Sequence, residues 1–221
     1  MDIYTKYTMD PHGFAKRVIE EQTRYKLESV KDYISEIELK FKRDMEEINK
    51  RYEAEVAARH LDLETLKRMG EDFAVDYFEI EKVLLNIFRR SILVMVYSFI
   101  ENSMNSLCRY LHGYKKLSIG IDDLKGVGIE RAKLYLEKVC LIDLPNTWSR
   151  LEKLNRIRNC IVHAEGDVDA TKSPGKLKNI IRHTKGLELE SDRFIIIKES
   201  YVNSIVSSAE IFFNQLYEKA L

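Results

Sequence analysis

Proline and glycine are scarce in this sequence, with three and nine occurrences in 221 residues. Because both residues interrupt regular helices, their scarcity favours long helical segments over a fold of many short strands and tight turns. Net charge is lacking too, since 36 basic side chains balance 36 acidic ones. A chain without a global positive field attracts nucleic acid only through a local cluster of cations.

Cysteines and long apolar runs are also limited. The three cysteines, Cys108, Cys140 and Cys160, lack the spacing of a metal site or a disulfide framework. The longest apolar run, residues 91–100, is much shorter than the roughly 20 residues that cross a bilayer. The N-terminus has no apolar signal-peptide core. We therefore expect a soluble, cytoplasmic protein without membrane contact, metal or cofactor, whose cysteines are reduced core residues.

Apolar residues recur at helical spacing along most of the chain. A loose tail precedes a first amphipathic pattern at about 14–59, and a second long helix starts after Asp62, a suitable N-cap, and runs to about 112. The fold class predicted is all-α: a tail and long helical arm at 1–79, then a helical bundle at 80–221. Within the bundle we expect helices at 129–140, 147–164 and 199–219, with a small β-hairpin at 187–198 that turns at Ser191–Asp192.

One predicted helix carries the residues that suggest chemistry. The segment LNRIRNCIVHAEG (154–166) holds two arginines, an asparagine and a histidine, and stops at a glycine. Asn159 and His163 are four residues apart and Arg156 and His163 are seven apart, so each pair shares a helix face. Arg158 is five residues before His163 and points about 140° away on an ideal helix. Only its long side chain or a loosened last turn would bring it back.

These residue types suit the cleavage of a phosphate diester. Imidazole transfers protons near neutral pH, and guanidinium binds phosphate oxygens and neutralises charge that grows in the transition state. RNA supplies its own nucleophile, the 2′-hydroxyl, so a metal is not required. The ordinary alternative is a helix end that carries arginine and histidine in favourable positions for the helix dipole.

The residues RNCIVHAEG (158–166) resemble the Arg-Asn-x-x-x-His signature of HEPN domains, which are all-α, usually dimeric, and often metal-independent ribonucleases. The neighbouring segments VMVYSFIENSMNSL and LKGVGIERAKLYLEKV are similar to the family's core helix and to the segment before its signature helix. The hairpin before the last helix fits as well. The likeness covers about 80–221, leaves the long first helix unexplained, and implies a HEPN-like helical bundle.

The resemblance also implies roles for individual residues. Arg158 would contact the scissile phosphate, His163 would act as acid or base, and Asn159 would hold the pair in place. Arg156 is a rival to Arg158, because the family tolerates four to six residues between the arginine and the histidine. Glu101 stands where members often carry an acid, and would polarise His163, pair with Arg158, or lie at the helix surface.

The resemblance implies function and partners too. The first hypothesis is an endoribonuclease, a toxin or antiviral-defence effector, that cleaves RNA by 2′-hydroxyl attack. HEPN nucleases join two copies of the motif, so we expect a homodimer or a dimer with another HEPN chain. An antitoxin or defence-system partner would bind the long N-terminal helix. The alternative is a non-catalytic HEPN-type module that binds a nucleotide or acts as a dimeric scaffold.

Two further segments offer nucleic-acid contacts. Residues 171–186 carry five cations and no acid, and would hold an RNA backbone unless they form only a solvated loop. Residues 124–136, LKGVGIERAKLYL, match the glycine pattern of helix-hairpin-helix modules that bind DNA, although tight helix packing needs the same glycines. From the first segment, the candidate RNA-binding residues are Lys172, Lys176, Lys178 and Arg182.

Overall fold

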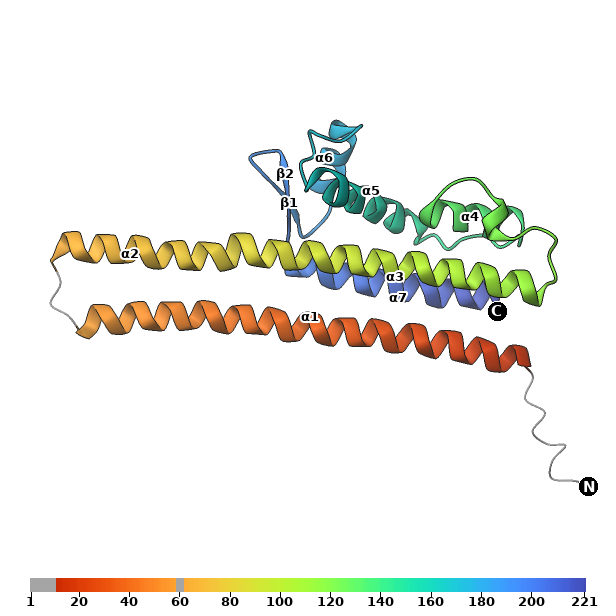
Figure 1. Ribbon diagram of the computed structural model, residues 1–221, viewed down its shortest axis with the longest axis horizontal. Helices are drawn as coiled ribbons and strands as arrows, with labels where there is room; N and C mark the ends of the chain where they lie inside the picture. The colour runs from red at the N-terminus through yellow and green to blue at the C-terminus, as the bar shows by residue number, and fades with distance from the viewer. Residues whose placement is uncertain (1–10, 59–61) are drawn as a thin grey trace, which may run out of the picture. The chain divides into compact units, whose positions relative to one another are not determined.

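The structure is a computed structural model that describes residues 11–58 and 62–221. The predicted loose tail lies almost wholly outside the described residues, as does the start of the predicted break after the first helix. The elements run in the following order (Figure 1): α1 Pro11–Ala58, α2 Leu63–Phe78, the π-helix η2 Glu79–Leu84, α3 Leu85–Tyr114, the 3-10 helix η3 Ile121–Asp123, α4 Gly128–Lys138, α5 Trp148–Ala164, α6 Pro174–Arg182, β1 Leu187–Glu190, β2 Phe194–Ile197 and α7 Glu199–Ala220.

The all-α fold class is confirmed, together with the long first helix and the hairpin before the last helix. The chain divides into two compact units that are discontinuous in sequence. The first comprises residues up to Val30 with Val94–Asn159 and Ser204–Leu221, and the second comprises Lys31–Leu93 and Cys160–Asn203. The proposed division into an arm at 1–79 and a bundle at 80–221 stays a prediction.

The first unit has a core of large apolar side chains from α3, α4, α5 and α7. The ring of Phe99 lies 5.9 Å from that of Phe213, and Trp148 lies 6.2 Å from Phe212 between centroids. Aromatic pairs at such distances add to the stabilisation from apolar burial. The core confirms the apolar periodicity seen in the sequence, with buried residues that include Ile100, Met104, Leu107, Leu136, Leu154, Ile157 and Leu216.

In the second unit, α2 runs beside the later part of α1 (Figure 1), and the rings of Tyr52 and Phe73 lie 5.3 Å apart. Asp62 is the N-cap of α2, as predicted: its Oδ1 accepts a 2.8 Å hydrogen bond from the backbone N–H of Thr65. The predicted second long helix is therefore confirmed. It runs through a π-helical turn at Glu79–Leu84 before α3 begins.

The hairpin also belongs to the second unit. Strands β1 and β2 are antiparallel with Leu187 opposite Ile197, and the predicted turn residues Ser191 and Asp192 have left-handed φ values of 51° and 55°. Residues 171–186, for which a solvated loop was the alternative to RNA binding, contain the helix α6. Pro174 at its first position suits a helix start, and Leu177 and Ile181, one turn apart, are buried.

The helical stretch Leu63–Tyr114 contains an 18-residue window with a mean hydropathy of 1.6, which is apolar enough to cross a membrane by length and composition. Core helices of soluble proteins pass the same test, and 44% of this window is buried in the protein. Leu93, Val96 and Ile100 are among the buried side chains of α3. The stretch Leu63–Tyr114 is the one such stretch among the described residues, and it is compatible with a soluble protein.

Candidate functional site

Helix α5 places its four signature residues by its own periodicity. Its buried side recurs every three residues through Leu151, Leu154, Ile157 and Cys160, so the intervening polar residues point outward. Arg156, Asn159 and His163 are exposed, and Arg158 is partly buried. By helical period the three exposed residues share one face of α5, while Arg158 lies on its flank.

The end of α5 lies just beyond His163. The helix is regular through Ala164, so a loosened last turn at His163 is not what brings Arg158 toward this face. Glu165 and Gly166 then take left-handed φ values of 51° and 82°, and the Gly166 N–H donates a 3.1 Å hydrogen bond to the Cys160 carbonyl. Gly166 thus ends the helix, as predicted, and leaves His163 exposed in its last turn.

The side chain of Arg158 contacts Asn159 on its own helix and Tyr97 on α3. Its Nη1 donates a 2.9 Å hydrogen bond to Oδ1 of Asn159. Its guanidinium carbon lies 5.0 Å from the ring centroid of Tyr97 on α3, within the range of a cation–π contact. The sequence did not single out Tyr97, because a tyrosine in an apolar run has no signal beyond core packing.

Asn159 thus contacts Arg158 directly, while the role that the resemblance implies for it, to hold Arg158 and His163 in place, stays a prediction. Its amide nitrogen donates a 3.2 Å hydrogen bond to Oδ1 of Asn155, one helical turn earlier. The Arg158 and Asn155 contacts fix the orientation of the Asn159 amide from both sides.

Glu101 lies partly exposed on α3, one turn after Tyr97. Burial raises the pKa of Tyr97, the Glu101 carboxylate raises it further, and the positive charge of Arg158 opposes both effects. In the described part of the chain Glu101 and Arg158 form no ion pair. The acid therefore lies near Tyr97, and its predicted roles toward Arg158 and His163 stay predictions.

The glycines that resemble a helix-hairpin-helix turn are used for packing. Gly128 opens α4 with a φ of +62°, and a Cβ at this position would lie 3.3 Å from the Tyr97 hydroxyl oxygen. Ala132, one turn later, is fully buried. Small residues let the start of α4 approach α3 closely, which accounts for the pattern without DNA.

The basic segment is less positive than its sequence indicates. Lys178 forms ion pairs of 2.9 Å with Asp169 and 3.3 Å with Asp192, and Arg182 forms one of 2.7 Å with Asp192. These acids lie outside residues 171–186 and reach the segment through the fold. Among the candidate RNA-binding residues, Lys172 and Lys176 are exposed and have no acid within ion-pair distance in the described part of the chain.

Glu38 and Arg89 form a buried ion pair that has no signal in the sequence. Glu38 on α1 is only 2% exposed, and its two carboxylate oxygens each accept a 2.7 Å hydrogen bond from the Arg89 guanidinium on α3. Arg89 also donates to the Ile197 carbonyl of β2 at 3.3 Å. An isolated glutamate in a charge-rich helix carries no signal of burial, because its partner is 51 residues away.

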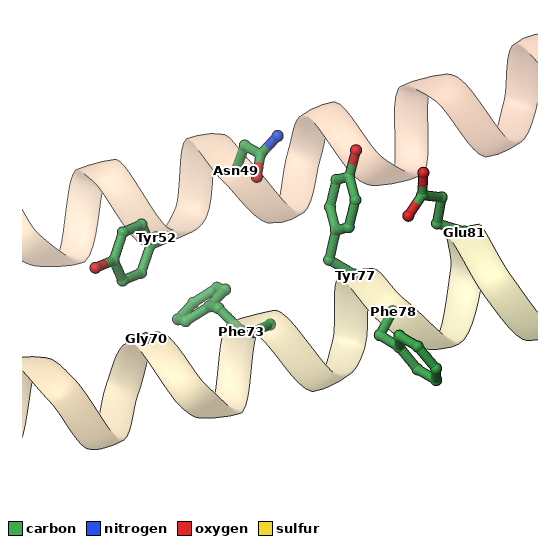
Figure 2. A pocket seen from close by; sticks show the side chains of 8 residues that line it. Asn49, Tyr52, Gly70, Phe73, Tyr77, Phe78 and Glu81 are labelled. Carbon is green, nitrogen blue, oxygen red and sulfur yellow. The ribbon is translucent and has the colours of Figure 1, made fainter. Parts of the chain in front are cut away.

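An aromatic pocket of about 530 Å³ lies between α1 and α2 (Figure 2). Phe73 extends toward Tyr52, and Tyr77 reaches toward α1 near Asn49. Gly70 leaves room beneath Tyr52, since a Cβ there would lie 3.5 Å from the Tyr52 hydroxyl. The pocket is part of the packing of α2 on α1, and none of the signature residues of α5 lines it.

Within residues 11–58 and 62–221, no group of three or more His, Cys, Asp or Glu side chains is arranged to hold a metal ion. Burial raises the pKa of the Cys108 thiol to about 12 and that of Cys160 to about 11, so neither is a ready nucleophile. Comparisons with family models, with curated proteins and with solved structures found no match for the chain.

Proposed function

We propose that the protein is a HEPN-type, metal-independent endoribonuclease that acts as a toxin or antiviral-defence effector in the cytoplasm. The observation that carries the proposal is the 2.9 Å hydrogen bond between Arg158 and Asn159 on a helix whose exposed face ends in His163. This arrangement combines an oriented guanidinium with an accessible imidazole. It agrees with the roles that the family resemblance implies.

The chemistry requires no group from outside the protein and the RNA. The 2′-oxygen attacks the adjacent phosphorus while the bond from phosphorus to the 5′-oxygen breaks. The 2′-hydroxyl proton leaves through one imidazole, and the 5′-oxygen receives a proton from an imidazole, so the products are a 2′,3′-cyclic phosphate and a 5′-hydroxyl. Arg158 binds the phosphate oxygens and stabilises the charge that develops on them.

The partners follow from the same proposal. A homodimer, or a dimer with another HEPN chain, would place two imidazoles and two guanidiniums around one RNA strand. Lys172 and Lys176 would contact the RNA backbone, since they are exposed and no acid of residues 11–58 or 62–221 pairs with them. An antitoxin or defence partner would bind α1, where Tyr25 is 72% and Tyr33 50% exposed.

The test is RNA cleavage in EDTA by the wild type, His163→Gln, and His112→Gln as a matched histidine control on α3. We expect the wild type and His112→Gln to cut single-stranded RNA, and His163→Gln to lose about 10²–10⁴-fold in rate, the usual contribution of an acid–base group. The new ends should carry a cyclic phosphate. A substrate with 2′-O-methyl groups should remain intact because it lacks the nucleophile.

Two outcomes would contradict the proposal. Cleavage of the 2′-O-methyl substrate would exclude 2′-hydroxyl attack, and equal activity of His163→Gln and wild type would exclude this imidazole. Folded wild type that binds RNA or a nucleotide without cutting would support the alternative, a non-catalytic dimeric module.

A further inference from the structure

The chain that follows His163 is attached to the rest of its unit by several backbone contacts. The Ile195 N–H on β2 donates a 3.0 Å hydrogen bond to the Gly166 carbonyl, and the Val168 N–H donates one of 3.0 Å to the Arg193 carbonyl. Asp167 also forms a bridge to Phe194. Residues 166–168 therefore run beside β2 and pair with it over a short length.

Arg90 on α3 holds the same place through its guanidinium. Its Nη1 donates a 3.0 Å hydrogen bond to the Glu165 carbonyl, and its Nη2 donates one of 2.7 Å to the Ile195 carbonyl. The first carbonyl belongs to the residue directly after α5, and the second to the strand against which the chain then packs. Charged donors form stronger hydrogen bonds than neutral ones, particularly when partly buried. Arg90 thus joins the end of α5 to β2.

The backbone conformation of Gly166 and its lack of a side chain both suit this position of Arg90. Its φ of +82° is one that side chains rarely adopt, and a Cβ there would lie 2.6 Å from Nη2 and 2.9 Å from Cζ of Arg90. The guanidinium therefore packs directly on the glycine backbone. Gly166 therefore both ends helix α5 and leaves the space in which the Arg90 guanidinium packs.

Neighbouring residues of α3 anchor β2 from the same side. The Asn86 Oδ1 accepts a 3.2 Å hydrogen bond from the Ile197 N–H, and Arg89 donates to the Ile197 carbonyl at 3.3 Å. With Arg90, three side chains of one helix thus fix the backbone of β2. The strand is therefore the support against which Arg90 holds the last turn of α5.

We infer that Arg90 is a positioning residue for His163: its guanidinium holds the carbonyl two residues after the imidazole and so fixes the last turn of α5. This inference rests on the proposed nuclease function for its catalytic consequence, but its structural content does not depend on activity. Arg90 does not itself contact the substrate in this scheme. In the proposed nuclease, Arg90 fixes the position of the His163 imidazole when RNA binds.

The experiment compares Arg90→Met, Arg90→Lys and Arg193→Met by NMR with histidine-labelled protein. Arg193→Met is the matched control, because Arg193 pairs with Asp167 at 2.6 Å on the same segment but is half exposed. In Arg90→Met we expect a changed His163 ring signal and broadened amide signals at 163–168, with an unchanged His112 signal. Arg90→Lys should restore part of the wild-type pattern, since its ammonium reaches only one carbonyl at a time.

Activity gives the second readout where the wild type cleaves RNA. Misplacing a reacting group by about 1 Å costs on the order of 10²-fold in rate, so Arg90→Met should lower kcat by about 10–100-fold and leave KM nearly unchanged. An unchanged His163 signal in folded Arg90→Met would overturn the inference, as would an equal effect of Arg193→Met. If Arg90→Met does not fold, Arg90→Lys is tested by the same His163 and 163–168 signals. A partly changed His163 signal would support the inference, and an unchanged signal would overturn it. An inactive wild type would count against the nuclease alone.

Discussion

At the residue scale, the two arginines of α5 occupy different environments. Arg158 is held by Asn159 and by the ring of Tyr97, whereas Arg156 is exposed on the face that it shares with Asn159 and His163. A guanidinium that is already oriented loses less conformational freedom when it binds phosphate. In the proposed nuclease, these contacts favour Arg158 as the phosphate ligand, whereas the helical phase favours Arg156.

We predict that Arg158→Ala lowers kcat/KM for RNA cleavage by about 10²–10³-fold, the usual loss when one donor to a developing negative charge is removed. Arg156→Ala should cost only a few-fold. Steady-state cleavage rates of the two variants measure the difference. The reverse order would transfer the phosphate role to Arg156.

The buried pair of Glu38 and Arg89 gives a second prediction at this scale. Glu38→Met leaves the Arg89 charge without its partner and should lower the free energy of unfolding by about 3–5 kcal/mol. The double variant with Arg89→Met as well should lose much less, because no unpaired charge remains. Urea denaturation followed by circular dichroism measures both.

The control for this prediction is Lys40→Met on the same helix. Lys40 pairs with Asp44 at 2.9 Å, but both side chains are exposed, so its removal should change the free energy of unfolding by less than about 1 kcal/mol. If the single and double variants lose the same free energy of unfolding, the unpaired Arg89 charge is not the cause of the loss in Glu38→Met.

At the element scale, the end of α5 depends on Gly166. We predict that Gly166→Ala lowers the free energy of unfolding by at least about 1–2 kcal/mol, the cost of a left-handed residue with a side chain, to which the clash with Arg90 adds. Gly175→Ala is the matched control, since nothing lies within 4 Å of its Cβ position in α6. It should be neutral or stabilising by up to about 1 kcal/mol. Thermal and urea unfolding of the two variants measure the difference. An unchanged free energy of unfolding in Gly166→Ala would contradict the role of Gly166 at the end of α5.

Elements differed in how much of them could be predicted from local sequence. α1, α5 and α7 have long apolar periods and were predicted to within a few residues. α6 was missed because its nine residues carry only a Pro174 start and the buried pair Leu177 and Ile181, against a polar background. A short helix gains most of its stability from tertiary packing, so its local signal is weak.

At the scale of the whole molecule, the proposed function predicts a two-fold dimer. Val162, beside His163, is 44% exposed, and an apolar side chain in this position suits an interface. We predict a species of twice the 26.0 kDa chain mass in sedimentation velocity, with specific activity that rises with protein concentration. Burying one valine contributes about 1.5–3 kcal/mol, so Val162→Glu should weaken dimerisation by more than about tenfold.

Val127→Glu is the matched control for the dimer, because Val127 is exposed in a different part of the chain, before α4. It should leave both the mass and the activity unchanged. A wild type that stays monomeric at every concentration while cleaving RNA would contradict the dimer.

The sequence by itself determined the helical class, the hairpin with its turn, the cap at Asp62, and the face of α5 that carries Arg156, Asn159 and His163. These features follow from apolar periodicity, turn chemistry and helix geometry, all of which act over a few neighbouring residues. Only the tertiary structure decided that Arg158 lies against Tyr97, that Asp192 neutralises Lys178, that Glu38 is buried with Arg89, and that Arg90 holds the end of α5. Each of these contacts joins residues distant in sequence, whose pairing depends on how the helices pack and not on any local pattern.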